Sequence, residues 1–242
     1  MAEIGYGYGS EWHLMRFMAR HRDVLEEIIR RELGVDDNNK DVFHWLDFDF
    51  NINGNGITLD DELKGLSFID KASNIVFDPE VVKTIDSHYI KGWKSGRGAQ
   101  SWDAVFTYNN TIYLVEAKAR IGEIKDSRKN HGGESKEIIK DLMTNQLIKF
   151  GIQVSDAWMG EYYQLANRLT TAALLNNCGI KAKCLYLYFL NGYDKPNDNQ
   201  NAEEKSFKKA VDDEMNALGL DPDSVKQLYI GIYIDCLKDY EL

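Results

Sequence analysis

The sequence of 242 residues is short of the features that mark several protein classes. Its three cysteines, Cys178, Cys184 and Cys236, form no Cys-x-x-Cys pair, and its five histidines lack metal-ligand spacing. We therefore expect buried thiols in a reducing compartment and no disulfide framework. No long uncharged apolar run could span a bilayer, and the first residues do not resemble a signal peptide. These absences predict a cytoplasmic protein with no membrane segment.

Positive charge is also scarce. There are 29 Lys and Arg residues against 39 Asp and Glu residues, which gives a formal net charge of −10. That balance argues against a protein that coats nucleic acid, which would present a basic face. It does not exclude an enzyme acting on nucleic acid, because such an enzyme holds its cation with acidic residues and needs only a local basic surface.

The chain reads as one α/β domain over residues 1–242. Hydrophobic residues make up 43% of it, enough for one sizeable core, and no linker-like stretch divides it. Residues 53–100 are predicted to form an irregular insertion before a hairpin. The order of the other elements predicts a mixed central sheet flanked by helices. Periodicity predicts helices at 10–33, 134–150, 156–177 and 201–218, and strands at 42–52, 101–108, 111–119, 181–191 and 226–236.

The hairpin at 101–119 is the clearest unit. Asn109-Asn110 separates two alternating strands, and asparagine tolerates the left-handed angles of a tight turn. A two-residue turn there sets Asp103 directly opposite Glu116, with β-carbons about 4.5–5.5 Å apart. Lys118 shares the face of Glu116, because strand side chains alternate. Two carboxylates and a lysine are thus expected to converge at one end of the hairpin.

Two facing acids repel each other unless a positive charge neutralises them. A bound Mg²⁺ would do so, since it accepts carboxylate oxygens and retains several waters. Lys118 would then lie near a water and a phosphate, where it could orient the nucleophile or stabilise developing charge. The alternative is an ordinary ion pair of Lys118 with Glu116 or Asp103. The apolar stripe that continues the same face favours the metal site; it consists of Val105, Ile112 and Leu114.

Asp103 followed by Glu116-Ala117-Lys118 resembles the Asp…(Asp/Glu)-x-Lys signature of the PD-(D/E)XK, or restriction-endonuclease-like, nuclease superfamily. The element order is similar to the αβββαβ core of that superfamily. More of the chain resembles an uncharacterised bacterial family within it, over most of residues 9–190. The matching pieces are Gly9-Ser10-Glu11-Trp12-His13-Leu14, Trp45-Leu46-Asp47-Phe48, Trp102-Asp103-Ala104-Val105, Glu116-Ala117-Lys118-Ala119 and Tyr163-Gln164-Leu165-Ala166-Asn167-Arg168-Leu169.

The resemblance implies a nuclease-type fold and dependence on Mg²⁺ or Mn²⁺. It implies metal ligands at Asp103, Glu116 and the backbone carbonyl of Ala117, with Glu11 from the first helix joining them. Glu11 also lies on the apolar stripe of that helix, although an acid at a helix start is favoured by the helix dipole alone. The chain departs from the family pattern after the motif, where Arg120-Ile121-Gly122-Glu123 replaces His-Ile-Pro-Glu.

Further residues are candidates for substrate binding. Gln164 and Arg168 lie one helical turn apart and share a face. The resemblance implies that Gln164 helps to hold the site or substrate, whereas Arg168 either binds phosphate or pairs with an acid. Lys125, Arg128 and Lys129 lie in a glycine-containing loop that either tracks a nucleic-acid backbone or is simply solvated.

These observations predict a metal-dependent nuclease that hydrolyses phosphodiester bonds, in DNA by preference, through a metal-activated water. One alternative is a catalytically inactive relative that uses the fold as a binding or assembly module. Another is a nucleotide or small-molecule enzyme that reuses the hairpin, although no Gly-rich phosphate loop supports nucleotide hydrolysis. The sequence leaves the oligomeric state and the choice between DNA and RNA open.

Overall fold

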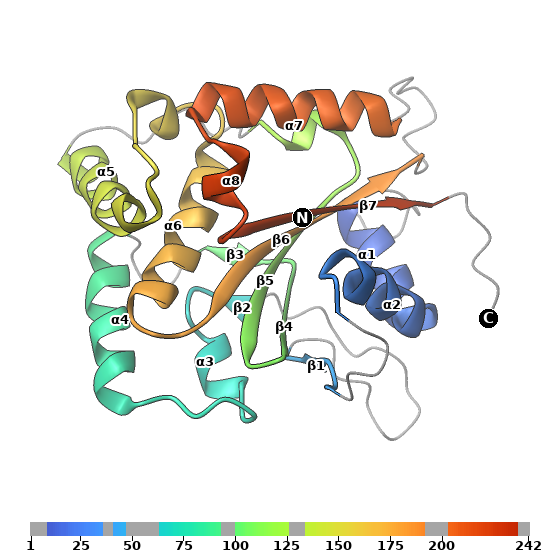
Figure 1. Ribbon diagram of the computed structural model, residues 1–242, viewed down its shortest axis with the longest axis horizontal. Helices are drawn as coiled ribbons and strands as arrows, with labels where there is room; N and C mark the ends of the chain where they lie inside the picture. The colour runs from blue at the N-terminus through green and yellow to red at the C-terminus, as the bar shows by residue number, and fades with distance from the viewer. Residues whose placement is uncertain are drawn as a thin grey trace.

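The computed structural model describes residues 9–35, 41–46, 63–92, 100–125, 134–191 and 203–236. It confirms an α/β architecture with a mixed five-stranded sheet in the order β1-β4-β5-β6-β7 (Figure 1). β4 pairs antiparallel with β1 and β5, whereas β5, β6 and β7 run parallel to one another. A second, two-stranded sheet joins β2 to β3. The strands are β1 His44–Trp45, β2 Leu63–Lys64, β3 Ser101–Trp102, β4 Ala104–Tyr108, β5 Thr111–Lys118, β6 Ala182–Leu190 and β7 Tyr229–Asp235.

Helices cover both faces of the large sheet. α1 and α2 pack on one face, and α5, α6 and α7 lie on the other side of the strands (Figure 1). The helices are α1 Ser10–Arg20, α2 Arg22–Glu32, α3 Phe68–Lys71, α4 Pro79–Gly92, α5 Glu134–Leu147, α6 Tyr163–Asn177, α7 Glu204–Leu218 and α8 Pro222–Val225, with short 3-10 turns η2 Ile121–Glu123, η3 Ile148–Phe150 and η4 Asp156–Met159.

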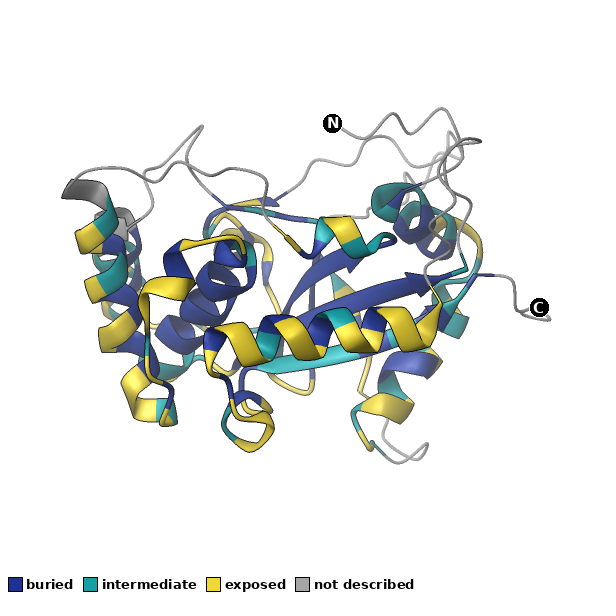
Figure 2. Ribbon diagram, turned by 90° about the horizontal axis from the view of Figure 1, so that it is seen from above, coloured by how far each residue is buried: buried dark blue, intermediate teal, exposed yellow. Residues whose placement is uncertain are grey.

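β6 is covered by a helical layer on each of its two faces. Its alternate residues face two different hydrophobic clusters, with Tyr186 and Tyr188 toward α6 and α7, and Leu185 and Leu187 toward α1 and α2. A strand buried on both faces has an almost continuous apolar sequence, as residues 182–190 do. α7 shows the opposite pattern, with one buried stripe and an exposed outer face (Figure 2).

The predicted helix at 10–33 is two helices. The chain turns at His21, whose φ and ψ of −137° and 34° are not helical. The turn keeps Phe17 of α1 and Leu25 of α2 in the same hydrophobic cluster. Gly34 follows α2 with a positive φ of 65°, the conformation that commonly ends a helix at glycine.

The prediction of an irregular insertion is wrong for residues 63–92, which contain β2, α3 and α4. α4 begins at Pro79, and the carboxylate of Asp78 accepts a hydrogen bond from the backbone N–H of Glu80 at 2.9 Å. Ile85 and Tyr89 of α4 are buried in a third cluster beside Trp102. Residues 53–62 and 93–99 of the predicted insertion, and 47–52 of the predicted first strand, lie outside the described residues.

The sequence predicted no disulfide framework and no membrane-spanning segment. The three cysteines are free thiols, so none forms a disulfide. Within the described ranges, no helix has the length and apolar character needed to cross a membrane.

Candidate active site

The hairpin turn sets the predicted register. Asn109 and Asn110 have positive φ angles of 48° and 53°, the conformation that a tight two-residue turn requires. Tyr108 therefore pairs with Thr111, and the ladder of β4 and β5 continues to Ala104 opposite Val115. The predicted register is confirmed over these pairs.

The ladder stops one pair before Asp103. The chain bends at this residue, which separates β3 from β4, so Asp103 is not the strand partner of Glu116 that the sequence predicted. Its side chain instead turns back to β5, where Oδ2 accepts a hydrogen bond from the backbone N–H of Ala117 at 2.7 Å. A short acidic side chain competes in this way with the regular ladder. The bend still leaves Asp103 beside the Glu116-Ala117-Lys118 segment.

Glu116 is the centre of a buried network of charges. The side chains of Lys118 and Glu116 are only 7% and 4% exposed, and Lys118 Nζ lies 2.6 Å from Glu116 Oε1. The same oxygen accepts a hydrogen bond from Gln164 Nε2 at 2.7 Å. Arg168 Nε donates to the other oxygen, Oε2, at 3.0 Å. α6 therefore supplies two of the three side chains that hold Glu116.

Arg168 is fixed more firmly than Lys118. Beyond Glu116, its Nη2 donates to the carbonyl of Ser101 at 2.6 Å, and its guanidinium carbon lies 4.5 Å from the ring centroid of Trp102. Lys118 Nζ makes one further hydrogen bond, to Gln164 Oε1 at 2.8 Å. The guanidinium ties α6 to β3 and β5, whereas among the described residues two side chains, Glu116 and Gln164, hold the ammonium.

The charges in this network shift one another's pKa values. Burial and the nearby charge of Glu116 raise the pKa of Asp103 well above its usual range. Burial also opposes ionisation of Glu116, but Lys118 and Arg168 outweigh it and lower its pKa. Likewise, burial favours the neutral amine of Lys118, but Glu116 and Asp103 outweigh it and raise the pKa of this amine. Glu116 and Lys118 are therefore an ion pair. Asp103 is the carboxyl of this network whose charged form its surroundings disfavour.

The oxygen donors present fit a magnesium-type site. Mg²⁺ is commonly held by one or two carboxylates together with waters and phosphates. Asp103 is partly exposed, and Oδ2 is its only oxygen that accepts a hydrogen bond from a described residue. The carbonyl of Ala117 points to the same side as its N–H, because a strand residue directs both groups to one neighbour. Asp103, Glu116 and this carbonyl form a set of hard oxygen donors.

Other predicted residues are placed as follows. Gln164 and Arg168 reach the site, where they bind Glu116. Lys125 is exposed and pairs with Glu161 at 3.0 Å. Arg128 and Lys129 lie outside the described residues. The part of the chain that the structure describes contains no group of three or more His, Cys, Asp or Glu side chains that could hold a metal ion, so Glu11 is not clustered with the two hairpin acids.

Glu214 on α7 was not among the predicted site residues. Glu214 is 2% exposed as a residue, and burial raises the pKa of its carboxyl to about 8. A signal was present, because Glu214 continues the buried stripe of Phe207 and Val211 at helical spacing. An acid in an apolar stripe needs a partner or a proton.

Comparisons of the chain with protein-family models, with curated proteins and with solved structures found no significant match. The interpretation of the site therefore depends on its geometry and on the resemblance of its motif.

Proposed function

We propose that this protein is a Mg²⁺-dependent nuclease with a restriction-endonuclease-like core, and that its substrate is DNA. The supporting observation is the convergence of Asp103 with the Glu116–Lys118 ion pair at the end of the hairpin. The order of α1, β1, the β4–β5 hairpin, α6 and β6 agrees with this arrangement.

Asp103, Glu116 and the carbonyl of Ala117 would hold the metal ion, without the additional ligand that the sequence predicted at Glu11. When bound, Mg²⁺ polarises a phosphoryl oxygen and lowers the pKa of a water. The Lys118 ammonium would position the attacking water and stabilise negative charge on the phosphate. Gln164 and Arg168 hold Glu116 in place. Of the two cations that bind Glu116, Lys118 makes fewer contacts with the described residues than Arg168 does.

An assay of single- and double-stranded DNA and RNA with Mg²⁺ or Mn²⁺ tests this proposal. We expect DNA cleavage that stops when the metal is chelated. The Asp103→Asn variant, purified in the same way, controls for a contaminating nuclease and should lose the activity. Absence of cleavage of every polymer by the wild type would contradict the proposal and favour a binding or assembly module.

A further inference from the structure

The two oxygens of the Glu116 carboxylate are held by different kinds of donor. Arg168 Nε lies 3.0 Å from Oε2, and the side chains of this pair are only 8% and 4% exposed. Oε1 instead accepts hydrogen bonds from the Lys118 ammonium at 2.6 Å and from Gln164 Nε2 at 2.7 Å. An arginine of α6 therefore engages one oxygen, and a lysine and an amide engage the other.

The guanidinium of Arg168 is anchored on its other sides as well. Its Nη2 donates to the carbonyl of Ser101 at 2.6 Å, and its Nη1 donates to Asn167 Oδ1 at 3.5 Å. Its face lies over the ring of Trp102, 4.5 Å from the centroid. A planar fork loses less side-chain entropy per hydrogen bond than a flexible ammonium does. Glu116 Oε2 is therefore committed to Arg168 more firmly than Oε1 is to its partners.

Asp103 is restricted in a similar way. Its Oδ2 accepts the backbone N–H of Ala117 at 2.7 Å, which fixes one oxygen of a partly exposed carboxyl. Each of the two proposed carboxylate ligands thus has one oxygen held by a group that the fold fixes. For Asp103 that group is a strand N–H, and for Glu116 it is an anchored guanidinium.

A carboxylate with one oxygen committed can offer a metal ion only the other. Ca²⁺ takes more oxygen ligands than Mg²⁺ does, in a flexible arrangement, and it often takes both oxygens of one carboxylate. Mg²⁺ retains several waters and needs only one or two carboxylates. The number of free oxygens on each carboxylate therefore discriminates between two ions of equal charge.

We propose that Arg168 determines the cation selectivity of this site, because by holding Glu116 Oε2 it limits Glu116 to one metal-binding oxygen and disfavours Ca²⁺ relative to Mg²⁺. This role rests on the metal site of the proposed function. The two edges of the guanidinium that Glu116 and Ser101 occupy are then not available to a phosphate.

The ratio of Ca²⁺ affinity to Mg²⁺ affinity tests this role without measuring cleavage. Calorimetric titration with each ion alone gives both affinities. Arg168→Met keeps an unbranched side chain beside Trp102 but releases Glu116 Oε2. Loss of one positive charge should strengthen the binding of both ions to a similar extent, because both carry two charges. The released oxygen should favour Ca²⁺ alone, so we expect the ratio to rise on the order of 10-fold.

Lys118→Met is the control for charge. It also removes a positive charge from Glu116, but it leaves Arg168 on Oε2. Both ions should bind at least as tightly as in the wild type, and the ratio of their affinities should not change. A ratio that rises as much in Lys118→Met as in Arg168→Met would show that charge sets the selectivity, and it would overturn the proposal.

Thr171→Val is the control for a looser site. Thr171 is fully buried on α6, and its hydroxyl donates to Gln100 Oε1 at 3.0 Å, directly before β3. This variant weakens the link between α6 and β3 but leaves the guanidinium of Arg168 in place. It should keep the wild-type ratio. An increase equal to that of Arg168→Met would mean that rigidity, and not the held oxygen, disfavours Ca²⁺.

Arg168→Lys keeps the test decisive if Arg168→Met does not fold, since removal of one partner of a buried ion pair is strongly destabilising. Lysine retains the charge but not the planar fork, so it cannot hold Oε2 and the Ser101 carbonyl together. Its ratio should also lie above that of the wild type. An unchanged ratio in folded Arg168→Met, or in Arg168→Lys when Arg168→Met does not fold, would overturn the proposal.

The same preparations separate this role from the nuclease function. If the wild type binds neither ion, the metal site is wrong and the role of Arg168 fails with it. If the wild type binds Mg²⁺ and cuts no polymer, only the nuclease function fails, and the ratio still decides the role of Arg168. If the wild type binds Mg²⁺ and cuts DNA while the ratio is the same in Arg168→Met, only the selectivity role fails.

Discussion

At the scale of residues, Lys118 and Asp103 should separate catalysis from metal binding. Lys118→Met keeps the aliphatic stem but removes the ammonium that occupies Glu116 Oε1. We expect it to bind Mg²⁺ at least as well as the wild type and to cut DNA about 10²- to 10⁴-fold more slowly. Asp103→Asn removes a negative ligand and should weaken Mg²⁺ binding itself. Calorimetry and cleavage assays on the same preparations measure both effects; wild-type cleavage by Lys118→Met would leave Lys118 as a structural ion-pair partner only.

Glu214 should also make the stability of the protein depend on pH. Its pKa rises from 4.5 to about 8 on folding, so between these values the folded state keeps a proton that the unfolded chain has released. Stability is therefore expected to fall as the pH rises through this window. Glu214→Gln should remove about a few kcal/mol of this dependence, at 1.36 kcal/mol per pH unit. Urea unfolding from pH 5 to pH 8 measures this pH dependence of the free energy of unfolding. If the free energy of unfolding of Glu214→Gln falls as steeply with pH as that of the wild type, the pKa of Glu214 is not raised by folding.

The sequence predicted the central residues of the site but not how they are held. Alternation of strand side chains placed Glu116 and Lys118 on one face, and helical spacing placed Gln164 and Arg168 together. The backbone hydrogen bond of Asp103 was not predictable from register, because a short carboxylate can replace a ladder bond wherever the strand bends. Burial of Glu116 depends on α6, whose distance from the hairpin the sequence does not specify.

At the scale of elements, short-range signals predicted the hairpin and could have revealed α4. The two asparagines determine the turn, and five strand pairs follow from it. Asp78 and Pro79 mark the start of α4, and Ile85 and Tyr89 repeat at helical spacing. Residues 53–100 also contain six glycines, which favour an irregular segment over a helix. The break at His21 has no proline or glycine to signal it, so tertiary packing determines where α1 ends.

The pairing of β6 with β7 gives a test at this scale. A β-carbon added at Gly231 would lie 2.7 Å from the hydroxyl oxygen of Tyr229 and 3.2 Å from the Tyr188 ring. Gly231→Ala should therefore destabilise the protein by about 1–3 kcal/mol, because the Tyr188–Tyr229 hydrogen bond must shift.

A double-mutant cycle isolates this clash. Adding Gly231→Ala to Tyr229→Phe should cost less than adding it to the wild type, since the nearest atom is gone. Gly122→Ala is the control, because no atom lies within 4 Å of its added β-carbon. Denaturant unfolding of the four proteins in the cycle measures the coupling. Equal costs of Gly231→Ala in both backgrounds would show that the hydroxyl is not the obstacle.

At the scale of the whole molecule, one sheet supports all three hydrophobic clusters. β6 contributes residues to each of them, and α6 contributes to two. Composition and the absence of a linker predicted a single domain, and this shared sheet supplies the physical reason to expect one cooperative unit. The candidate site depends on that arrangement, because its charged side chains come from the hairpin and from α6.

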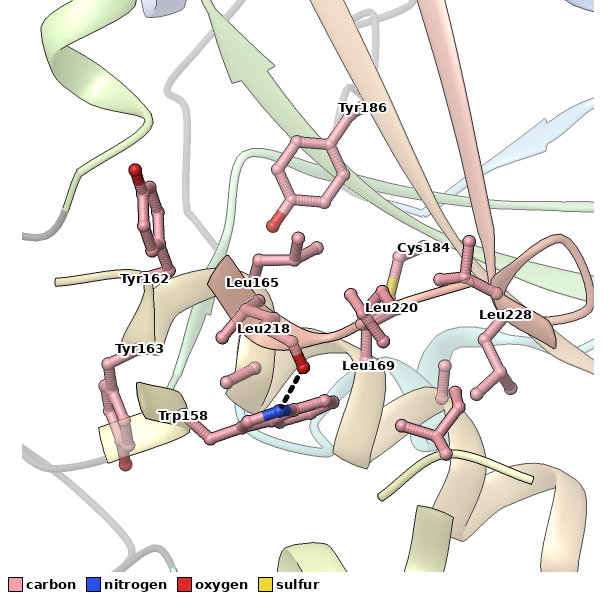
Figure 3. Packing of buried hydrophobic residues seen from close by; sticks show 14 of the residues in the cluster. Trp158, Tyr162, Tyr163, Leu165, Leu169, Cys184, Tyr186, Leu218, Leu220 and Leu228 are labelled. Carbon is pink, nitrogen blue, oxygen red and sulfur yellow. Dashed lines mark hydrogen bonds between the residues drawn. The ribbon is translucent and has the colours of Figure 1, made fainter. Parts of the chain in front are cut away.

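Two fully buried tryptophans test whether the molecule unfolds as one unit. Trp158 lies in the cluster under α7 and donates to the carbonyl of Leu218 at 2.8 Å (Figure 3). Trp102 lies in the cluster with α3 and α4 and donates to the carbonyl of Gly65 at 2.8 Å. In protein labelled with 5-fluorotryptophan, ¹⁹F NMR follows each indole separately, with signals assigned by Trp→Phe replacement. Because both clusters share β6 and α6, we expect the two native signals to disappear at the same urea concentration. Earlier loss of the Trp158 signal would mean that the α7 layer opens by itself, and Glu214 would then lie on a separately folding part of the molecule.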